Sequence, residues 1–191
     1  MFQRLGRATV LPKVLAVGGM TRSEIEAEVR AMLARLQQPD EGWTLDAVPR
    51  GDGTPHVEGN GPAYTLVIDA DGAEVSRETM DGYEVVYQLL RLQTKRIAMA
   101  CEQAARQMTM PGWIAPVGAW LPGRLIAQLG TDTYSRSTWI DAHCRLMDHL
   151  RGDWGARVRG EHEALLRRYP LTRNERENFR QLDLRPYGVR R

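Results

Sequence analysis

The chain has 191 residues, of which 42% are hydrophobic and 26% charged, a composition typical of a globular domain with a sizeable core. No apolar run approaches the roughly 18 residues needed to cross a bilayer, which argues against an integral membrane protein. The two cysteines form neither a disulfide framework nor a zinc motif, so a reducing cytoplasm is the expected compartment.

The formal net charge of +2 hides a strong separation of charge along the chain. Residues 38–84 hold eleven acidic side chains and two arginines, which gives a net charge of −9. Residues 1–37 carry a net charge of +3, and residues 85–191 carry +8. The sequence therefore predicts an acidic region followed by a basic one.

Residues 1–19 are expected to be a disordered leader. They contain Arg4 and Arg7 ahead of an apolar stretch, a weak likeness to a signal peptide. Pro12 and Lys13 interrupt that stretch, and its end is a poor cleavage site. Secretion is therefore not the favoured interpretation.

A helix is predicted to follow the leader. Thr21 and Glu24 have the spacing of a capping box, in which each side chain satisfies the backbone N–H of the other residue. The residues that follow repeat on one helical face: Ile25, Val29, Met32, Leu33 and Leu36. Pro39 lies just beyond the predicted end.

A small antiparallel sheet is predicted next. Residues 43–48 are a candidate first strand, although their alternation is imperfect, and residues 54–58 could form a short edge strand. Residues 64–68 have the highest β-propensity, and residues 73–78 are their expected hairpin partner. The dipeptide at positions 71–72 is Asp-Gly, which suits a tight turn.

A long helix is predicted to begin at Asp81, where Glu84 repeats the capping-box spacing. We expect it to continue to Met110, before Pro111 and Gly112, and to reach about 40 Å. Such a helix would cross the whole domain and pack against the sheet along one face.

Residues 109–135 contain Trp113 and Trp120 among several prolines and glycines, with a short helix expected over 122–129. A third long helix is predicted to start at Ser137 or Thr138.

The third helix is expected to end at Gly152. A fourth helix follows from Asp153 through Arg168, where Pro170 stops it. Together the elements predict an α+β fold: an N-terminal helix and a small antiparallel sheet with a hairpin, packed against a long helix and a C-terminal helical layer. Residues 20–170 should form a single domain. An arginine-rich tail over 171–191 follows, with a brief helix over 174–182.

No residues form a recognised catalytic or metal-binding motif. His56 and Glu58 alternate on one strand face, but no third ligand follows at a metal-like spacing. His143 and Cys144 are adjacent in a helix and point about 100° apart, so they cannot act as a pair. His162 is expected on a solvated helix face.

We therefore expect no enzyme, no catalytic residue, no cofactor and no metal. Zinc-protease, nucleophile-elbow, phosphate-loop and dinucleotide-binding motifs are absent from the sequence. A small hydrolase using His56 and Glu58 is the weakest alternative.

The basic C-terminal half allows a second interpretation, a nucleic-acid-binding regulator. Acidic residues interrupt the arginine-rich tail at Glu175, Glu177 and Asp183, and no series of aromatic residues accompanies it. Nucleic acid is therefore the less favoured partner.

The acidic side chains of the predicted hairpin region allow two interpretations. They belong to the acidic block of residues 38–84 and lie on the hairpin and at the start of the next helix: Asp69, Asp71, Glu74, Glu78, Asp81 and Glu84. They could form a solvated sheet face balanced by basic helices elsewhere in the fold. Alternatively, they could form a docking face for a basic protein, because opposite charges steer encounter between proteins.

Several short motifs occur in a characteristic order. They are Gly-Thr-Pro-His-Val-Glu at 53–58, Tyr-Thr-Leu-Val at 64–67, the helix start at 81–87 running to Ala98-Met99-Ala100, Asp-Trp-Gly-Ala-Arg at 153–157, Glu-His at 161–162 and Leu-Leu-Arg-Arg-Tyr-Pro at 165–170. In this order and spacing, the chain resembles the immunity protein sixty-three family of bacterial polymorphic toxin systems over residues 50–170. The segment at 109–135 and the longer tail depart from the family pattern.

The resemblance implies a cytoplasmic α+β protein encoded beside a secreted toxin of a contact-dependent, Rhs-type or type VI system. It implies tight one-to-one binding to the cognate toxin domain, which occludes the toxin's active site. The family supplies no catalytic residues. The first candidate toxin-binding surface is Asp69, Asp71, Glu74, Glu78 and Glu84, which would suit a basic toxin such as a nuclease. Trp113 and Trp120 are a second candidate surface, because exposed tryptophans often anchor interfaces.

Overall fold

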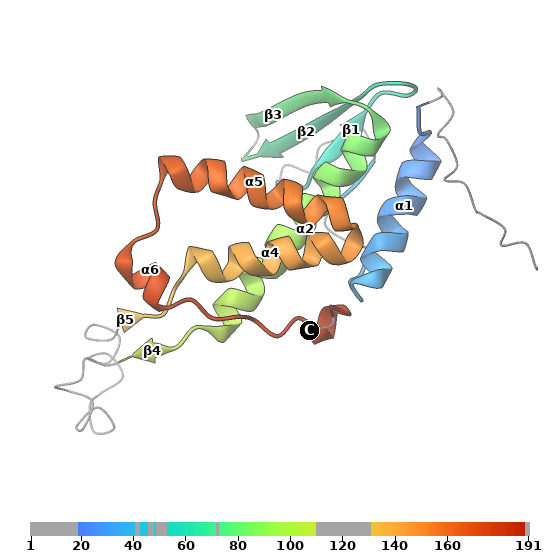
Figure 1. The fold of residues 1–191 in the computed structure, drawn as a ribbon. Coiled ribbons are helices and arrows are strands. Elements are labelled where there is room, and N and C mark those ends of the chain that lie inside the picture. Colours follow the sequence, from blue (N-terminus) through green and yellow to red (C-terminus); the bar gives the residue numbers. More distant parts are fainter. Residues whose placement is uncertain are drawn as a thin grey trace, which may run out of the picture.

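The computed structural model describes residues 19–40, 43–45, 48, 53–71, 73–109 and 131–189, and its fold belongs to the α+β class, as predicted (Figure 1). Its main helices are α1 (Arg22–Arg35), α2 (Gly82–Ala105), α4 (Arg136–Leu150), α5 (Gly152–Arg168) and α6 (Arg173–Glu177). One sheet contains β1 (His56–Glu58), β2 (Tyr64–Ala70) and β3 (Ala73–Met80). A short ladder joins β4 (Met108–Thr109) to β5 (Thr131–Asp132), and the turn η2 (Arg185–Tyr187) follows near the C-terminus.

Helix α1 confirms both its predicted cap and its apolar face. The Thr21 hydroxyl accepts a hydrogen bond from the Glu24 backbone N–H, and the Glu24 carboxylate accepts one from the Thr21 backbone N–H at 2.7 Å. The predicted stripe is buried throughout: Ile25, Val29, Met32, Leu33 and Leu36. Capping and burial of one face therefore fix this helix together.

The three-stranded sheet is antiparallel in the order β1-β2-β3. The hairpin predicted between residues 64 and 78 is present, and Asp71 adopts a positive φ of 52° at its turn. The strand predicted over 43–48 is wrong for residues 43–45, which are not in a strand. They run beside β1 instead, where the Thr44 backbone N–H donates to the Pro55 carbonyl at 3.2 Å.

Helix α2 is the central element of the core. The Asp81 carboxylate caps it by accepting from the Glu84 backbone N–H at 2.8 Å. Its length of 24 residues corresponds to about 36 Å, and it ends earlier than predicted, because Arg106 is extended and leads into β4. Helices α1 and α4 and the sheet contact α2, while α5 packs against α4 as its antiparallel neighbour (Figure 1).

The segment expected as an arginine-rich tail contributes to the same core. Leu182, Leu184 and Val189 are buried, and the Arg145 guanidinium of α4 donates to the Leu182 carbonyl at 3.0 Å. The chain then reaches the end of α1, where a Cβ on Gly188 would lie 2.9 Å from the Arg35 carbonyl oxygen. Residues 178–189 therefore form a strap across α4 and α1.

Candidate protein-interaction surface

The register of the sheet places its residues in two rows. Val57, Leu66 and Glu78 lie opposite one another on the row that faces the helical core. His56, Val67 and Arg77 lie on the opposite row, the outer face; His56 and Val67 are buried there, and Arg77 on the edge strand is exposed. The two faces differ in that the ionic contacts of the sheet lie on the outer face, beside the buried Val67, while apolar contacts to the helical core lie on the inner one.

Arg77 organises the charges of the outer face. Its guanidinium contacts the Glu58 carboxylate at 2.7 Å and the Glu74 carboxylate at 2.9 Å. These hydrogen bonds hold the pKa of Glu58 below its usual range and raise the pKa of Arg77. Glu74, predicted as a docking residue, is therefore neutralised within the chain.

Asp69 also has an internal contact. Its carboxylate lies 3.4 Å from Nδ1 of His56, a buried histidine whose Nε2 lies 3.7 Å from the Glu58 carboxylate. The side chain of Asp69 is only 17% exposed. Asp69 thus faces the outer-face charge cluster and offers little of its carboxylate to a partner.

Strand β3 forms the free edge of the sheet (Figure 1). Its side chains are exposed or half-exposed on both faces along all eight residues, and Val75 is 67% exposed. Glu78 is exposed although it lies opposite the buried Leu66, because none of the described helices packs closely on β3. Within the described ranges, neither Asp71 nor Glu78 forms an ion pair, so these two carboxylates remain open to a partner.

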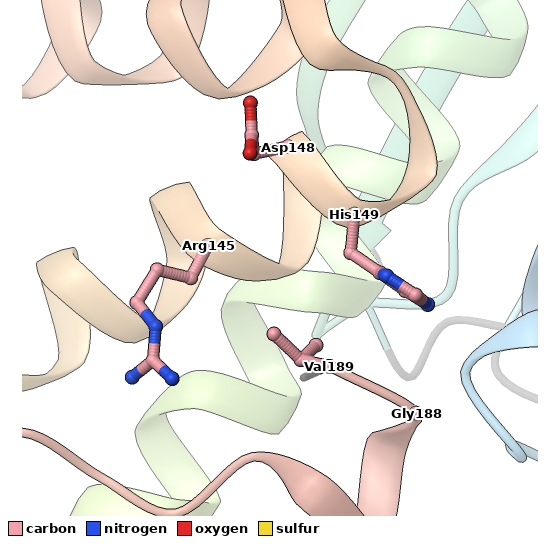
Figure 2. A pocket seen from close by; sticks show the side chains of 5 residues that line it. All are labelled: Arg145, Asp148, His149, Gly188 and Val189. Carbon is pink, nitrogen blue, oxygen red and sulfur yellow. The ribbon is translucent and has the colours of Figure 1, made fainter. Parts of the chain in front are cut away.

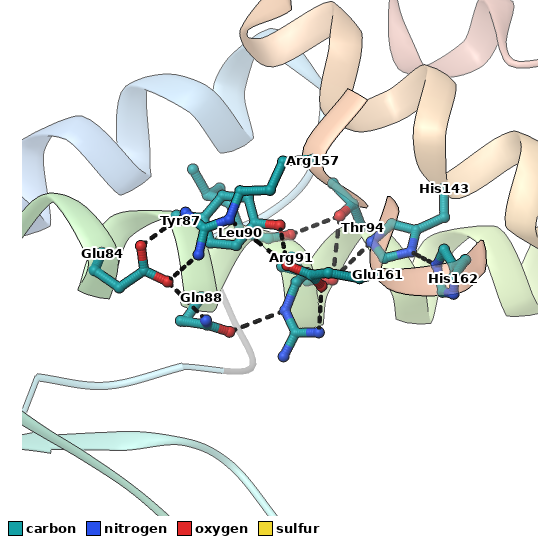
Figure 3. Close-up of polar contacts among 10 residues, drawn as sticks. All are labelled: Glu84, Tyr87, Gln88, Leu90, Arg91, Thr94, His143, Arg157, Glu161 and His162. Atoms are coloured by element: carbon teal, nitrogen blue, oxygen red, sulfur yellow. Dashed lines mark hydrogen bonds and ion pairs between the residues drawn. The ribbon is translucent and has the colours of Figure 1, made fainter. Parts of the chain in front are cut away.

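Glu84 lies apart from the hairpin acids, in the first turn of α2. Its carboxylate accepts two hydrogen bonds from the Arg157 guanidinium of α5, at 2.7 and 2.6 Å, and one from Gln88 at 2.8 Å (Figure 3). These contacts lower the pKa of Glu84. Its role is to join α2 to α5, so the five predicted docking acids do not form one surface.

A double-mutant cycle on Glu84 and Arg157 is expected to give a coupling of about 0.5–1 kcal/mol, because both side chains are partly solvated. Chemical denaturation of Glu84→Gln, Arg157→Gln and the double variant measures it at pH 7. Since the folded-state pKa of Glu84 is lowered, the coupling should be present above the ordinary carboxyl pKa and disappear as the pH falls through the folded value. A coupling indistinguishable from zero would contradict the α2–α5 link.

The same network continues into a buried histidine pair (Figure 3). His143 Nε2 lies 3.1 Å from the Arg91 carbonyl and must donate to it, so the neutral His143 accepts at Nδ1 from His162 Nε2 over 2.9 Å. The ring of His162 packs edge-on against Trp139. The prediction that His162 lies on a solvated face is therefore wrong, because the α4–α5 contact buries it.

Burial sets the protonation of both histidines. Desolvation and the neighbouring His162 lower the pKa of His143 to about 3. Desolvation, followed by the charge of Lys95, lowers the pKa of His162. Both rings are consequently neutral at pH 7 and serve the contact between α4 and α5. Cys144, which follows His143, has its pKa raised to about 11 by burial, so it is held as a thiol.

A cavity of about 290 Å³ lies between the end of α4 and the strap (Figure 2). Arg145, Asp148 and His149 contribute polar groups to its walls, together with Gly188 and Val189. Their side chains point in different directions (Figure 2). They do not converge on a common ligand position, so this cavity is not the favoured binding site.

Trp113 and Trp120, the second predicted surface, lie outside the described residues. Arg77 and Arg157, the two arginines that form ion pairs with the predicted docking acids, are not among the residues predicted for the site. Arg77 carried a usable signal, as one of two arginines in the acidic block, whereas Arg157 contacts an acid 73 positions away and carried none.

Across the described ranges, no group of three or more histidine, cysteine or acidic side chains is arranged to hold a metal ion. No helix in that part of the chain combines the length and apolar character that a membrane crossing requires. Comparisons of the chain with protein-family models, with curated proteins and with solved structures give no significant match.

Proposed function

We propose that this protein is an immunity protein, which binds a cognate secreted bacterial toxin and occludes the toxin's active site. It acts in the cytoplasm of the producing cell against a toxin of a contact-dependent, Rhs-type or type VI system. The resemblance of residues 50–170 to the immunity protein sixty-three family supports the proposal, and so does the open edge of the sheet.

The free edge of β3 is the observation that carries the proposal. An edge strand presents a row of unpaired backbone N–H and C=O groups, which is a ready template for a strand from another protein. Most edge strands are short, bulged or covered; β3 has one register irregularity, opposite Ile68 and Asp69, but it spans eight residues with both faces open. The exposed Val75, which the irregularity leaves without a pairing partner in β2, adds an apolar contact in the first half of the strand.

The charge of this edge indicates the chemistry of its partner. Asp71 lies in the hairpin turn and Glu78 in the second half of β3, and neither forms an ion pair among the described residues. A basic toxin surface would supply the missing counter-charges and would be steered toward the edge.

The basic C-terminal half gives less support to nucleic-acid binding. Three of its arginines form ion pairs within the chain: Arg136 with Glu175, Arg173 with Glu177, and Arg185 with Asp183. Each pair removes a positive charge that phosphate groups would need.

Co-expression with the toxin encoded beside this chain tests the proposal. The expected result is survival of the expressing cells and a stable one-to-one complex by size-exclusion chromatography. Absence of both a complex and protection would reject the immunity function.

Glu78→Lys is expected to slow association with that toxin domain about tenfold at low salt, because it reverses a steering charge on the edge. Surface plasmon resonance at two ionic strengths measures the rate. Glu163→Lys is the matched control, since it reverses the charge of another exposed glutamate, which belongs to α5 and not to the sheet. Equal association rates for the two variants would exclude the β3 edge from the interface.

A further inference from the structure

A groove of about 730 Å³ lies between α1 and the beginnings of α2 and α5. It is distinct from the β3 edge and from the cavity at the end of α4. Its size falls within the range of pockets that bind ligands or the side chains of a partner.

The floor of the groove is apolar and shallow on one side. Ala27 and Ala31 of α1 are exposed along it, while Val86 and Trp154 form the opposite wall. Gly82 at the start of α2 allows a close approach here, because a Cβ on it would lie 2.7 Å from the Met20 Cβ and 3.2 Å from Cδ1 of Ile25 in α1. The groove is therefore part of the fixed α1–α2 packing.

The rim of the groove is acidic. Glu24, Glu28 and Asp81 contribute three carboxylates, of which those of Glu24 and Asp81 also accept the capping hydrogen bonds of α1 and α2. Arg151 contributes the one cation among the lining residues that the structure describes, so the rim keeps an excess of negative charge. The aromatic wall already holds that cation, since the Arg151 guanidinium lies 5.0 Å from the centre of the Tyr83 ring. A ligand with apolar and cationic groups together would complement both the floor and the rim.

The residues of α1 that line the groove repeat at helical spacing. Glu24, Ala27, Glu28 and Ala31 follow the pattern i, i+3, i+4, i+7, which gives a straight stripe along two turns. Small side chains in such a stripe allow a second helix to approach to the shorter end of the usual 8–10 Å between helix axes.

We propose that this groove binds a basic amphipathic helix of a partner protein. The apolar face of that helix lies on the exposed Ala27 and Ala31, and its lysine or arginine side chains reach the negatively charged rim. The identity of the partner as the toxin rests on the proposed function, whereas the chemistry of the groove does not.

The test uses a synthetic lysine–leucine peptide of roughly 15 residues with leucines at helical spacing, and a glutamate–leucine peptide of the same pattern. Binding to the full chain is followed by tryptophan fluorescence and by amide NMR shifts. The lysine peptide should shift the resonances of Ala27, Ala31 and Gly82, and the glutamate peptide should leave them unchanged.

Ala31→Arg is expected to weaken binding of the lysine peptide at least about tenfold, since it fills the groove and adds a repelling charge. Ala34→Arg is the matched control: Ala34 is also exposed on α1 but does not line the groove, so its affinity should stay within about twofold. Glu28→Lys provides a second variant that changes the rim charge without filling the floor.

Equal affinities for the two arginine variants, or peptide shifts confined to residues outside the groove, would overturn the proposal. Capture of the toxin by the wild-type protein together with that result would leave the immunity function standing. Peptide binding in the groove without any toxin complex would support the groove and reject the immunity function.

Discussion

Gly155→Ala is expected to lower the free energy of unfolding by about 2 kcal/mol, measured by chemical denaturation. Gly155 lies where α5 crosses α4, and a Cβ there would lie 2.6 Å from the Asp148 Cβ and 3.0 Å from the Cys144 carbonyl oxygen. Two of the three nearest atoms belong to the backbone of α4, so relief requires the helices to move apart. The gain in helix propensity from alanine offsets only about 1 kcal/mol of that cost.

Gly160→Ala is the matched control in the same helix. Nothing lies within 4 Å of a Cβ at this exposed position, so the substitution should raise stability by roughly 0.5–1 kcal/mol. Opposite signs for two identical substitutions in one helix would locate the α4–α5 contact at Gly155. Stabilisation by both would show that α4 and α5 are not in close contact there.

Acidification from pH 7.5 to pH 5 is expected to cost about 2 kcal/mol of stability through His143 alone. Its folded-state pKa of about 3 lies below the unfolded value, so the unfolded chain binds more protons over this range. The stabilising effect is fully present above about pH 6.5 and is lost as the pH falls toward the folded pKa. His162, whose pKa is also lowered, adds to the same trend.

Urea denaturation at several pH values checks this result. His143→Gln keeps a donor for the Arg91 carbonyl but removes the titrating ring, and its stability should depend less on pH. His149→Gln is the control, because His149 belongs to the same helix but lies outside the buried pair. An unchanged pH dependence in His143→Gln would show that the pair is not the source.

Local patterns predicted much of the fold because local interactions determine those parts. The face of α1 repeats Ile25, Val29 and Met32 at helical spacing, and the Thr21 cap needs a partner only three positions away. The end of α2 was missed because it depends on distant contacts. The chain leaves the helix to pair β4 with β5, and Met108 is the partner of Asp132.

The candidate surface was less predictable for the same reason. Counting charges identified the acidic block, but it could not reveal that Arg77 neutralises Glu74 or that Arg157 holds Glu84. His162 was misplaced because flanking glutamates suggest a solvated face, while its actual partner lies on α4. The high arginine content of the C-terminal segment likewise predicted a tail, whereas its Leu182 and Leu184 are buried in the core.

The strap also bears on how the chain folds. The Arg35 guanidinium donates to the carbonyls of His149 and Leu150, more than a hundred positions later, and Gly188 then closes over the Arg35 carbonyl. Contacts between such distant positions raise the contact order, which slows folding because large loops must close first. During synthesis, the last turn of α1 cannot form its contacts with α4 and the strap until nearly the whole described chain has left the ribosome.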